Sequence, residues 1–258
     1  MPHPILFMWS TPRALSTAFL RMMAERGDFL VVHEPFSSIV AEGHTTIDGV
    51  RLHHSADVTD LLREKARETG VFVKEVTDAR YDLLDDPGFP YLGTHTFLLR
   101  HPEQTIASHY AMKNEVTCDE IGYGHLLDLF ETVRPPFGDL PVVVEAENLI
   151  TAPEAVVRDY CRRTGIPFVP EAMDWSPQDR PEWQRTAAWH RDAARSSGFN
   201  PVAKQYPVNI HNDGRLAALY AAHIGAYEQL RAYAAGAVGT AVPARRPERR
   251  EMTAADAR

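Results

Sequence analysis

Cysteine is scarce in this chain: only Cys118 and Cys161 occur among 258 residues, far apart and without a CxxC pair. We therefore expect both thiols to be reduced and the protein to be cytoplasmic. Long apolar runs are also missing, so nothing in the sequence predicts a membrane span. The first residues lack the basic and apolar parts of a signal peptide, which favours the same compartment.

Lysine is the second shortage, because only four of the 27 basic residues are lysines. The net charge of −8 argues against a general nucleic-acid binder, since such proteins usually present a basic face. No HxH or HExxH pattern and no carboxylate cluster occurs, so we expect no metal site. Among so few lysines, Lys74 stands out because it interrupts an otherwise apolar run.

Short apolar runs alternate with amphipathic segments, which predicts an α/β fold around a mostly parallel sheet. The expected strands are Ile5–Trp9, Phe29–His33, Val71–Val76, Thr94–Leu99 and Pro141–Glu145. The expected helices are Leu15–Ala24, Val58–Glu68, Pro102–Met112, His125–Thr132, Pro153–Thr164 and Arg215–Ala235. We expect residues 1–235 to form one domain and residues 236–258, rich in Ala, Pro and Arg, to form a flexible tail.

The most informative segment connects the first strand to the first helix and reads Ser-Thr-Pro-Arg-Ala-Leu-Ser-Thr, from Ser10 to Thr17. Unpaired N–H groups and the helix dipole favour an anion at such a helix N-terminus. Arg13 adds a permanent cation, and Ser16 and Thr17 add hydroxyl donors. The pattern GxxxxGK[ST] is absent, so an ATPase or GTPase is a poor fit. The alternative is an ordinary strand–turn–helix with a capping Ser or Thr.

A second segment places a basic residue and a hydroxyl at another strand end. Arg100 ends the apolar run from Thr94, Pro102 opens a helical segment, and Ser108 follows Arg100 by eight residues. A guanidinium offers a planar fork of donors that suits phosphate, and Ser108 is within reach across a short helix. The alternative is a solvated Arg100 and an ordinary first-turn proline.

Together these segments resemble the sulfotransferases that use 3′-phosphoadenosine 5′-phosphosulfate (PAPS), over residues 5 to about 200. The family's PKSGTT or PRSGST loop corresponds to Pro12–Thr17, with Ala14-Leu15 where the family usually has Ser-Gly. The resemblance implies a three-layer α/β/α, P-loop NTPase-like sulfotransferase fold. It also implies donor-binding residues: Thr11, Pro12, Arg13, Ala14, Leu15, Ser16 and Thr17 for the 5′-phosphosulfate, Arg100 and Ser108 for the 3′-phosphate, and Ser196 and Ser197 in a late closing loop.

Sulfuryl transfer needs a base for the acceptor's proton and cations for the charge on the departing phosphate. We predict Glu34 as the base, because Pro35 should hold it extended at the crevice and partial burial should raise its pKa. His33 is the rival base. Lys74 and Arg13 would stabilise the leaving oxygen. The alternatives are a salt bridge for Lys74, a helix-capping or salt-bridging Glu34, and a strand-end His33 with a backbone partner. The family often has a histidine two residues after that lysine, where this chain has Val76, which leaves Glu75 and Asp78 as reserve bases.

The sequence therefore predicts transfer of a sulfuryl group from PAPS to a hydroxyl or amine of a small-molecule acceptor, leaving PAP. Two separate phosphate-binding segments fit PAPS, which has two separated anionic ends, better than they fit ATP. The alternatives are a non-catalytic scaffold that binds PAP or another nucleotide, and a divergent P-loop kinase. The sequence does not identify the acceptor. It does not determine the oligomeric state either, and a homodimer is one option.

Overall fold

Five parallel strands form the centre of the molecule, in the order β2-β5-β1-β6-β7. Their bounds are β1 (Ile5–Ser10), β2 (Phe29–His33), β5 (Gly70–Val76), β6 (Thr94–Leu99) and β7 (Val142–Glu145). The computed structural model describes residues 2–136, 138–199 and 204–234. All five predicted strands are confirmed, and no end differs by more than one residue.

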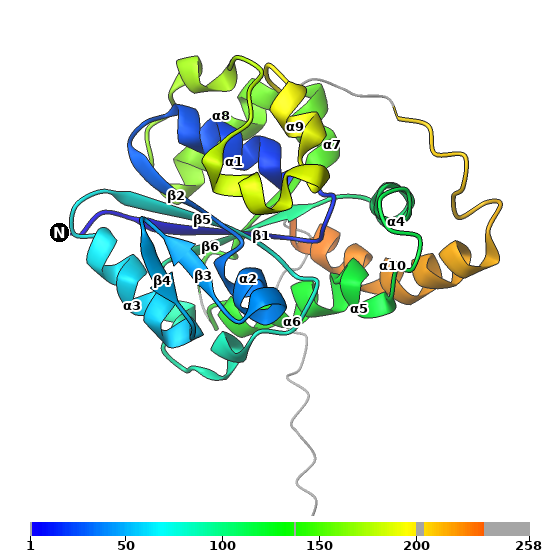
Figure 1. Cartoon of the computed structure of the whole chain (residues 1–258), viewed down its shortest axis with the longest axis horizontal. Helices are drawn as coiled ribbons and strands as arrows, with labels where there is room; N and C mark the ends of the chain where they lie inside the picture. The colour runs from blue at the N-terminus through cyan, green and yellow to red at the C-terminus, as the bar shows by residue number, and fades with distance from the viewer. Residues whose placement is uncertain (1, 137, 200–203, 235–258) are drawn as a thin grey trace, which may run out of the picture.

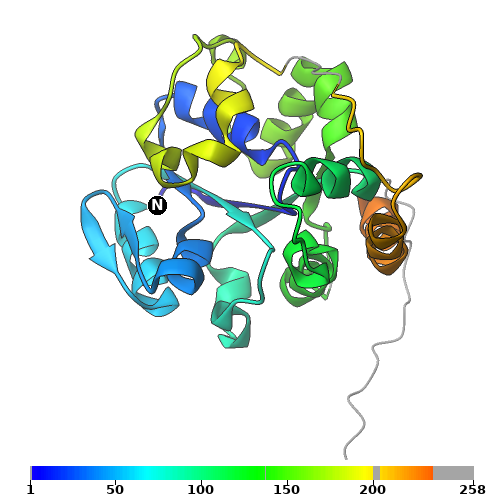
Figure 2. The ribbon, with the colours of Figure 1, turned by 45° about the vertical axis from the view of Figure 1, so that its right-hand side comes forward.

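Helices cover both faces of this sheet, so the predicted three-layer α/β/α architecture is confirmed (Figure 1). The six predicted helices are α1 (Ser16–Glu25), α3 (Ser55–Lys65), α4 (Pro102–Tyr110), α6 (Tyr123–Val133), α8 (Pro153–Thr164) and α10 (Gly214–Ala234). Figure 2, turned by 45°, also shows α1 in blue across the sheet from α3 in cyan and α6 in green.

Several shorter elements have no strong signal in the sequence. They are α2 (Pro35–Glu42), α5 (Cys118–Ile121), α7 (Ala146–Thr151), α9 (Arg191–Arg195) and a hairpin of β3 (Thr45–Ile47) and β4 (Val50–Leu52). Four 3₁₀ segments add η1 (Asp82–Asp85), η2 (Phe89–Tyr91), η3 (Pro170–Met173) and η4 (Pro181–Trp189). Of these, α2, η4 and α9 matter most, because residues in or beside them line the site.

Alternating residues of β1 pack on the two helical layers, as the period of a strand requires. Leu6 and Met8 share one core cluster with Phe19 of α1. Phe7 and Trp9 share the other core cluster, and Trp9 is fully buried. Because every β1 side chain is buried, the sheet fixes where the loop after Ser10 begins.

No helix within the described ranges combines the length and apolar character that a bilayer crossing needs. The predicted tail, 236–258, and the last expected helical position, 235, lie outside the described residues. The division into one domain and a tail therefore stays a prediction.

Candidate active site

A cavity of about 360 Å³ opens at the carboxyl ends of the central strands, where parallel sheets commonly bind ligands. The six residues Pro12–Thr17 that follow β1 line it, as do Glu34 after β2 and Arg100 after β6. Lys74, within β5, lines the same cavity. The structure thus brings the two predicted phosphate-binding segments and the predicted catalytic pair into one cavity. Thr11 is fully buried and is not among the described lining residues.

The loop after β1 leaves the N-terminus of α1 available to an anion. Leu15 is the N-cap, no side chain of the described residues caps this end of the helix, and the first turn carries no acidic residue. Arg13 and Leu15 both adopt left-handed backbone conformations, with φ of 66° and 69°. Leu15 therefore takes, at a steric cost, a conformation that a glycine would adopt freely.

Arg13 links this loop to the second segment and to a late part of the chain. Its Nε donates to Ser108 Oγ at 3.0 Å, and its Nη1 donates to the Trp189 carbonyl at 2.6 Å. Arg100 Nη1 in turn donates to the Arg13 carbonyl at 2.8 Å. The two arginines and Ser108 thus form one connected group, although Arg13 and Ser108 are 95 residues apart. Phosphate oxygens are the acceptors that such a group suits.

The predicted late loop reaches the cavity only in part. Ser196 lines the cavity, and its hydroxyl accepts from Trp175 Nε1 at 3.0 Å and donates to the Ala193 carbonyl at 2.8 Å. Ser197 is not among the described lining residues, and its carbonyl accepts from the Trp175 backbone N–H. Lys204 lines the cavity as well, a residue that the sequence analysis did not single out.

Glu34 and Lys74 form a buried ion pair between β2 and β5: Lys74 Nζ contacts Glu34 Oε1. The expectation that Pro35 holds Glu34 extended is wrong, because Glu34 has a φ of 47° and is the left-handed N-cap of α2. The Glu34 N–H donates to the Lys74 carbonyl at 2.8 Å, which continues the β2–β5 pairing. That bond and the ion pair hold Glu34 in this conformation against the preference of a pre-proline residue.

The expected rise in the pKa of Glu34 is also wrong in direction. Burial would raise that pKa, but Lys74, with His33 and His190 once acid protonates them, outweighs burial and holds it below its usual range. Glu34 is therefore ionised at neutral pH, as its contact with the Lys74 ammonium requires. A carboxylate in this state can accept a proton, and it becomes more basic if Lys74 moves away from it.

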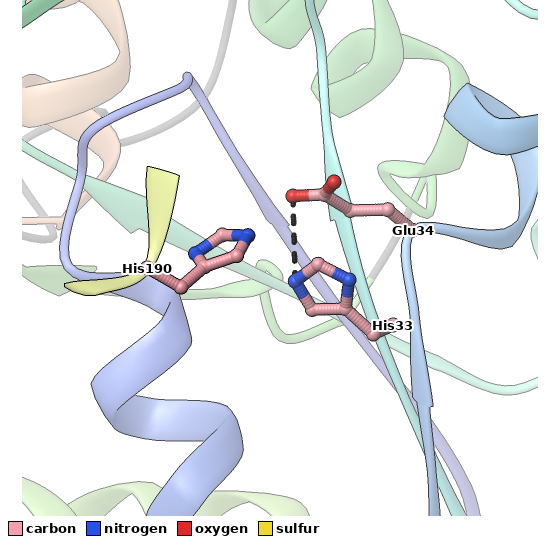
Figure 3. A group of neighbouring side chains, drawn as sticks. All are labelled: His33, Glu34 and His190. Carbon is pink, nitrogen blue, oxygen red and sulfur yellow. Dashed lines mark ion pairs between the residues drawn. The ribbon is translucent and has the colours of Figure 1, made fainter. Parts of the chain in front are cut away.

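Two histidines complete this cluster (Figure 3). His33 Nε2 is buried, has no hydrogen-bond partner within the described ranges, and lies 3.6 Å from Glu34 Oε1. His190, which follows η4, hydrogen-bonds Thr17 Oγ1 through Nδ1 at 2.9 Å and Thr186 Oγ1 through Nε2 at 3.0 Å. Burial, with Lys74, lowers the pKa of His190 to about 2; burial likewise lowers the pKa of His33 to about 4, so both rings are neutral at pH 7.

Sequence reasoning missed His190 as a site residue. The signal was the Trp189-His190 pair, which belongs to the stretch that resembles the family but follows no strand or motif. His190 lies 173 residues from Thr17 along the chain, and only folding brings the two side chains together.

His33, Glu34 and His190 could supply ligands to a metal, since their ligand atoms lie within 4.8 Å of one another. Lys74 Nζ already contacts the Glu34 oxygen that faces this group. A divalent ion would meet that ammonium at close range, which strongly disfavours its binding. The arrangement therefore suits a fixed cation supplied by the protein itself.

The two reserve bases differ sharply in position. Glu75 Oε2 accepts from the backbone N–H groups of Phe36 and Ser37, at 2.8 and 3.2 Å, and so caps the N-terminus of α2. Glu75 is not among the described lining residues, whereas Asp78 lines the cavity. Glu75 is thus a structural residue that supports α2 just behind Glu34.

Three comparisons bear on this site. A family model described as a sulfotransferase domain matches residues 5–234. Two curated Arabidopsis thaliana proteins, branched-chain-amino-acid aminotransferase-like proteins 2 and 1, are each 26% identical over 79% of this chain. The chain spans only 37% and 38% of their lengths.

Two solved structures are also similar, both at 14% identity over 86% of this chain. The sulfotransferase domain from the curacin biosynthetic pathway has a TM-score of 0.47, with 97% of that chain covered. The sulfotransferase domain from the Synechococcus PCC 7002 olefin synthase has a TM-score of 0.46, with 95% covered.

Proposed function

We propose that this chain, which belongs to the sulfotransferase-domain family, transfers a sulfuryl group from PAPS to a hydroxyl or amine of a small molecule. The observation that carries the proposal is one cavity that holds both an anion-binding loop and a buried Lys74–Glu34 pair. The loop supplies donors for phosphate and sulfonate oxygens, and the pair supplies a cation and a proton acceptor. Sulfuryl transfer needs each of these groups.

The residues present fit the donor's two anionic ends. Backbone N–H groups at the start of α1, with Ser16 and Thr17, suit the 5′-phosphosulfate. Arg100 and Ser108 suit the 3′-phosphate, and Arg13, bonded to Ser108, lies between the two groups. Each of these donors lines the cavity. An anion would therefore be bound when the donors exchange their present hydrogen bonds for bonds to its oxygens.

Lys74 and Glu34 would act in opposite directions during transfer. Glu34 accepts the proton of the acceptor's hydroxyl or amine as the new bond to sulfur forms. The bond from sulfur to the phosphate oxygen breaks, and Lys74 and Arg13 stabilise the negative charge on that oxygen. As Lys74 moves toward the leaving oxygen, the pKa of Glu34 rises, which improves the base when it is needed. The acceptor's proton leaves Glu34 for water after product release.

His33 remains the rival base. Its ring is neutral, and its Nε2, which has no hydrogen-bond partner among the residues that the structure describes, can accept a proton. Glu34, 3.6 Å away, would stabilise the resulting cation. Glu34 is favoured because it lines the cavity, whereas His33 is not among the described lining residues. On this basis His33 acts through Glu34.

The test is PAP formation from PAPS in the presence of small phenols, alcohols and amines, followed by chromatography. We expect PAP only when an acceptor is present, and a loss of at least about 100-fold in rate for Glu34→Gln. Glu154→Gln is the matched control, since Glu154 is an exposed residue paired with Arg158. Addition of a chelator should leave the rate unchanged, because Lys74 supplies the cation.

The remaining outcomes separate the alternatives. Tight PAP binding without turnover of any acceptor would favour a scaffold that binds PAP. Phosphoryl transfer from ATP that depends on Mg²⁺ would favour a divergent kinase.

A further inference from the structure

The charges on the donor side of the cavity favour an anionic ligand. Arg13, Arg100 and Lys204 line this part, near β1 and β6. One carboxylate, Asp192, lies among them: it pairs with Lys204 and stands 3.7 Å from Arg13 Nη2. Cations therefore outnumber carboxylates here, as expected for a region that holds phosphates.

Elsewhere on the cavity wall, each cationic side chain forms an ion pair with a carboxylate. The pairs are Lys74–Glu34, Lys113–Glu120 and Arg185–Glu42. Asp78 is the one lining carboxylate that forms no ion pair within the part of the chain that the structure describes. Asp78 therefore has no cation of its own among the described residues, although the charge of Lys74 also acts on it.

The described neighbours of Asp78 offer its carboxylate hydrogen bonds but no ion pair. Tyr81 Oη lies 2.6 Å from the Val76 carbonyl and 3.2 Å from Asp78 Oδ1. A phenol has a single proton, and the shorter contact identifies the Val76 carbonyl as its main acceptor. Burial, and then the charge of Glu34, raise the pKa of Asp78. A carboxylate in this position gains most from a positively charged partner.

Asp78 lies just beyond the end of β5, on the same cavity wall as Lys74. Lys74, Val76 and Asp78 all line the cavity and are spaced two residues apart along and just beyond β5. Four residues of strand span at most about 13 Å. A ligand group that pairs with Asp78 can therefore differ from the group that reacts beside Lys74, because the apolar Val76 lines the cavity between them along the chain.

We propose that the acceptor is a cationic small molecule, whose ammonium or similar group pairs with Asp78 while its hydroxyl or amine lies beside Glu34 and Lys74. This inference rests on the proposed function, since it assigns the acceptor side of the same cavity. Asp78 then determines specificity, because a neutral or anionic analogue would leave its carboxylate without a partner.

Two phenols test this directly: tyramine and 4-ethylphenol share a carbon skeleton and differ in one ammonium group. Each is titrated calorimetrically into the full chain saturated with PAP. We expect the wild type to bind tyramine about tenfold more tightly. Asp78→Asn should abolish this preference, and Asp159→Asn should keep it, since Asp159 is an exposed residue paired with Arg162. The variant Asp78→Lys should instead favour 3-(4-hydroxyphenyl)propionate.

A wild type that binds both phenols equally, or binds neither, would overturn the inference. A preference for tyramine that survives in Asp78→Asn and Asp78→Lys would do the same. The PAP titration that precedes each experiment reports separately on the proposed function, so failure to bind PAP would be seen as a failure of that function instead.

Discussion

Lys74 Nζ contacts Oε1 of Glu34, and both side chains are almost completely buried where β5 and β2 end. Neither charge faces bulk water, so the attraction between the two charges offsets the free-energy cost of removing them from water. The same contact keeps Glu34 ionised and places an ammonium at the cavity wall. One ion pair therefore supports both the fold at this edge and the proposed chemistry.

Breaking this pair from either side should destabilise the protein. We expect Glu34→Gln or Lys74→Met to lower the free energy of unfolding by about 3 kcal/mol, because each leaves one buried charge unpaired. The double variant should lose clearly less than the sum of the two, since no unpaired charge remains. Urea denaturation of the four proteins gives the coupling energy. Additive losses would contradict the pair as described.

Leu15 offers a test of the strained loop. The left-handed backbone at Leu15, with a φ of 69°, costs about 1 kcal/mol that glycine would avoid. We expect Leu15→Gly to change the free energy of unfolding by less than about 1 kcal/mol, because relief of strain offsets lost packing and added chain entropy.

The control is Leu20→Gly within the same helix, where Leu20 is fully buried. That change should cost at least about 3 kcal/mol, from the cavity and the helix penalty together. Similar losses for the two variants in thermal or urea melts would show that the backbone at Leu15 is not strained.

His95 predicts a pH dependence of stability in the core. Trp9 Nε1 donates to His95 Nδ1 at 3.1 Å, and burial lowers the pKa of His95 to about 4, below its ordinary 6.5. A depressed histidine pKa means that the unfolded chain binds the proton first, so stability falls as pH drops from about 6.5 toward 4.

Between pH 7 and pH 4.5 this single residue should account for roughly 2–3 kcal/mol. His95→Asn keeps an acceptor for Trp9 and removes the titrating group. Between pH 7 and pH 4.5, the free energy of unfolding of this variant should therefore fall less than that of the wild type, by roughly 2–3 kcal/mol. Parallel pH profiles for variant and wild type would rule out the assigned cause.

The sheet, and the position of the proposed phosphate-binding residues at one edge of it, could be predicted because their signals are local. A run such as Ile5–Trp9 is apolar throughout, and a buried parallel strand needs no partner information to be recognised. Arg13 and Arg100 follow such runs directly, so the geometry of parallel sheets places them at one edge. Their hydrogen-bonded link through the Arg13 carbonyl is a consequence of that edge.

The predictions that failed concern features that depend on contacts between distant segments of the chain. Pro35 predicts an extended Glu34, but the bond to the Lys74 carbonyl and the start of α2 impose the left-handed conformation. The pKa of Glu34 depends on Lys74 and His190, which lie 40 and 156 residues away along the chain. His190 itself follows an irregular 3₁₀ segment, which has no hydrophobic period to mark it.

The most direct test of the central claim is calorimetric titration of the purified chain with PAP, with ADP and ATP-Mg²⁺ as controls. The account predicts tight binding of PAP and much weaker binding of both controls. Arg13→Ala and Arg100→Ala should each weaken PAP binding by at least about tenfold, and exposed Arg158→Ala should not. A folded sample that does not bind PAP, or that prefers ATP-Mg²⁺, would contradict the assignment of this cavity to PAPS.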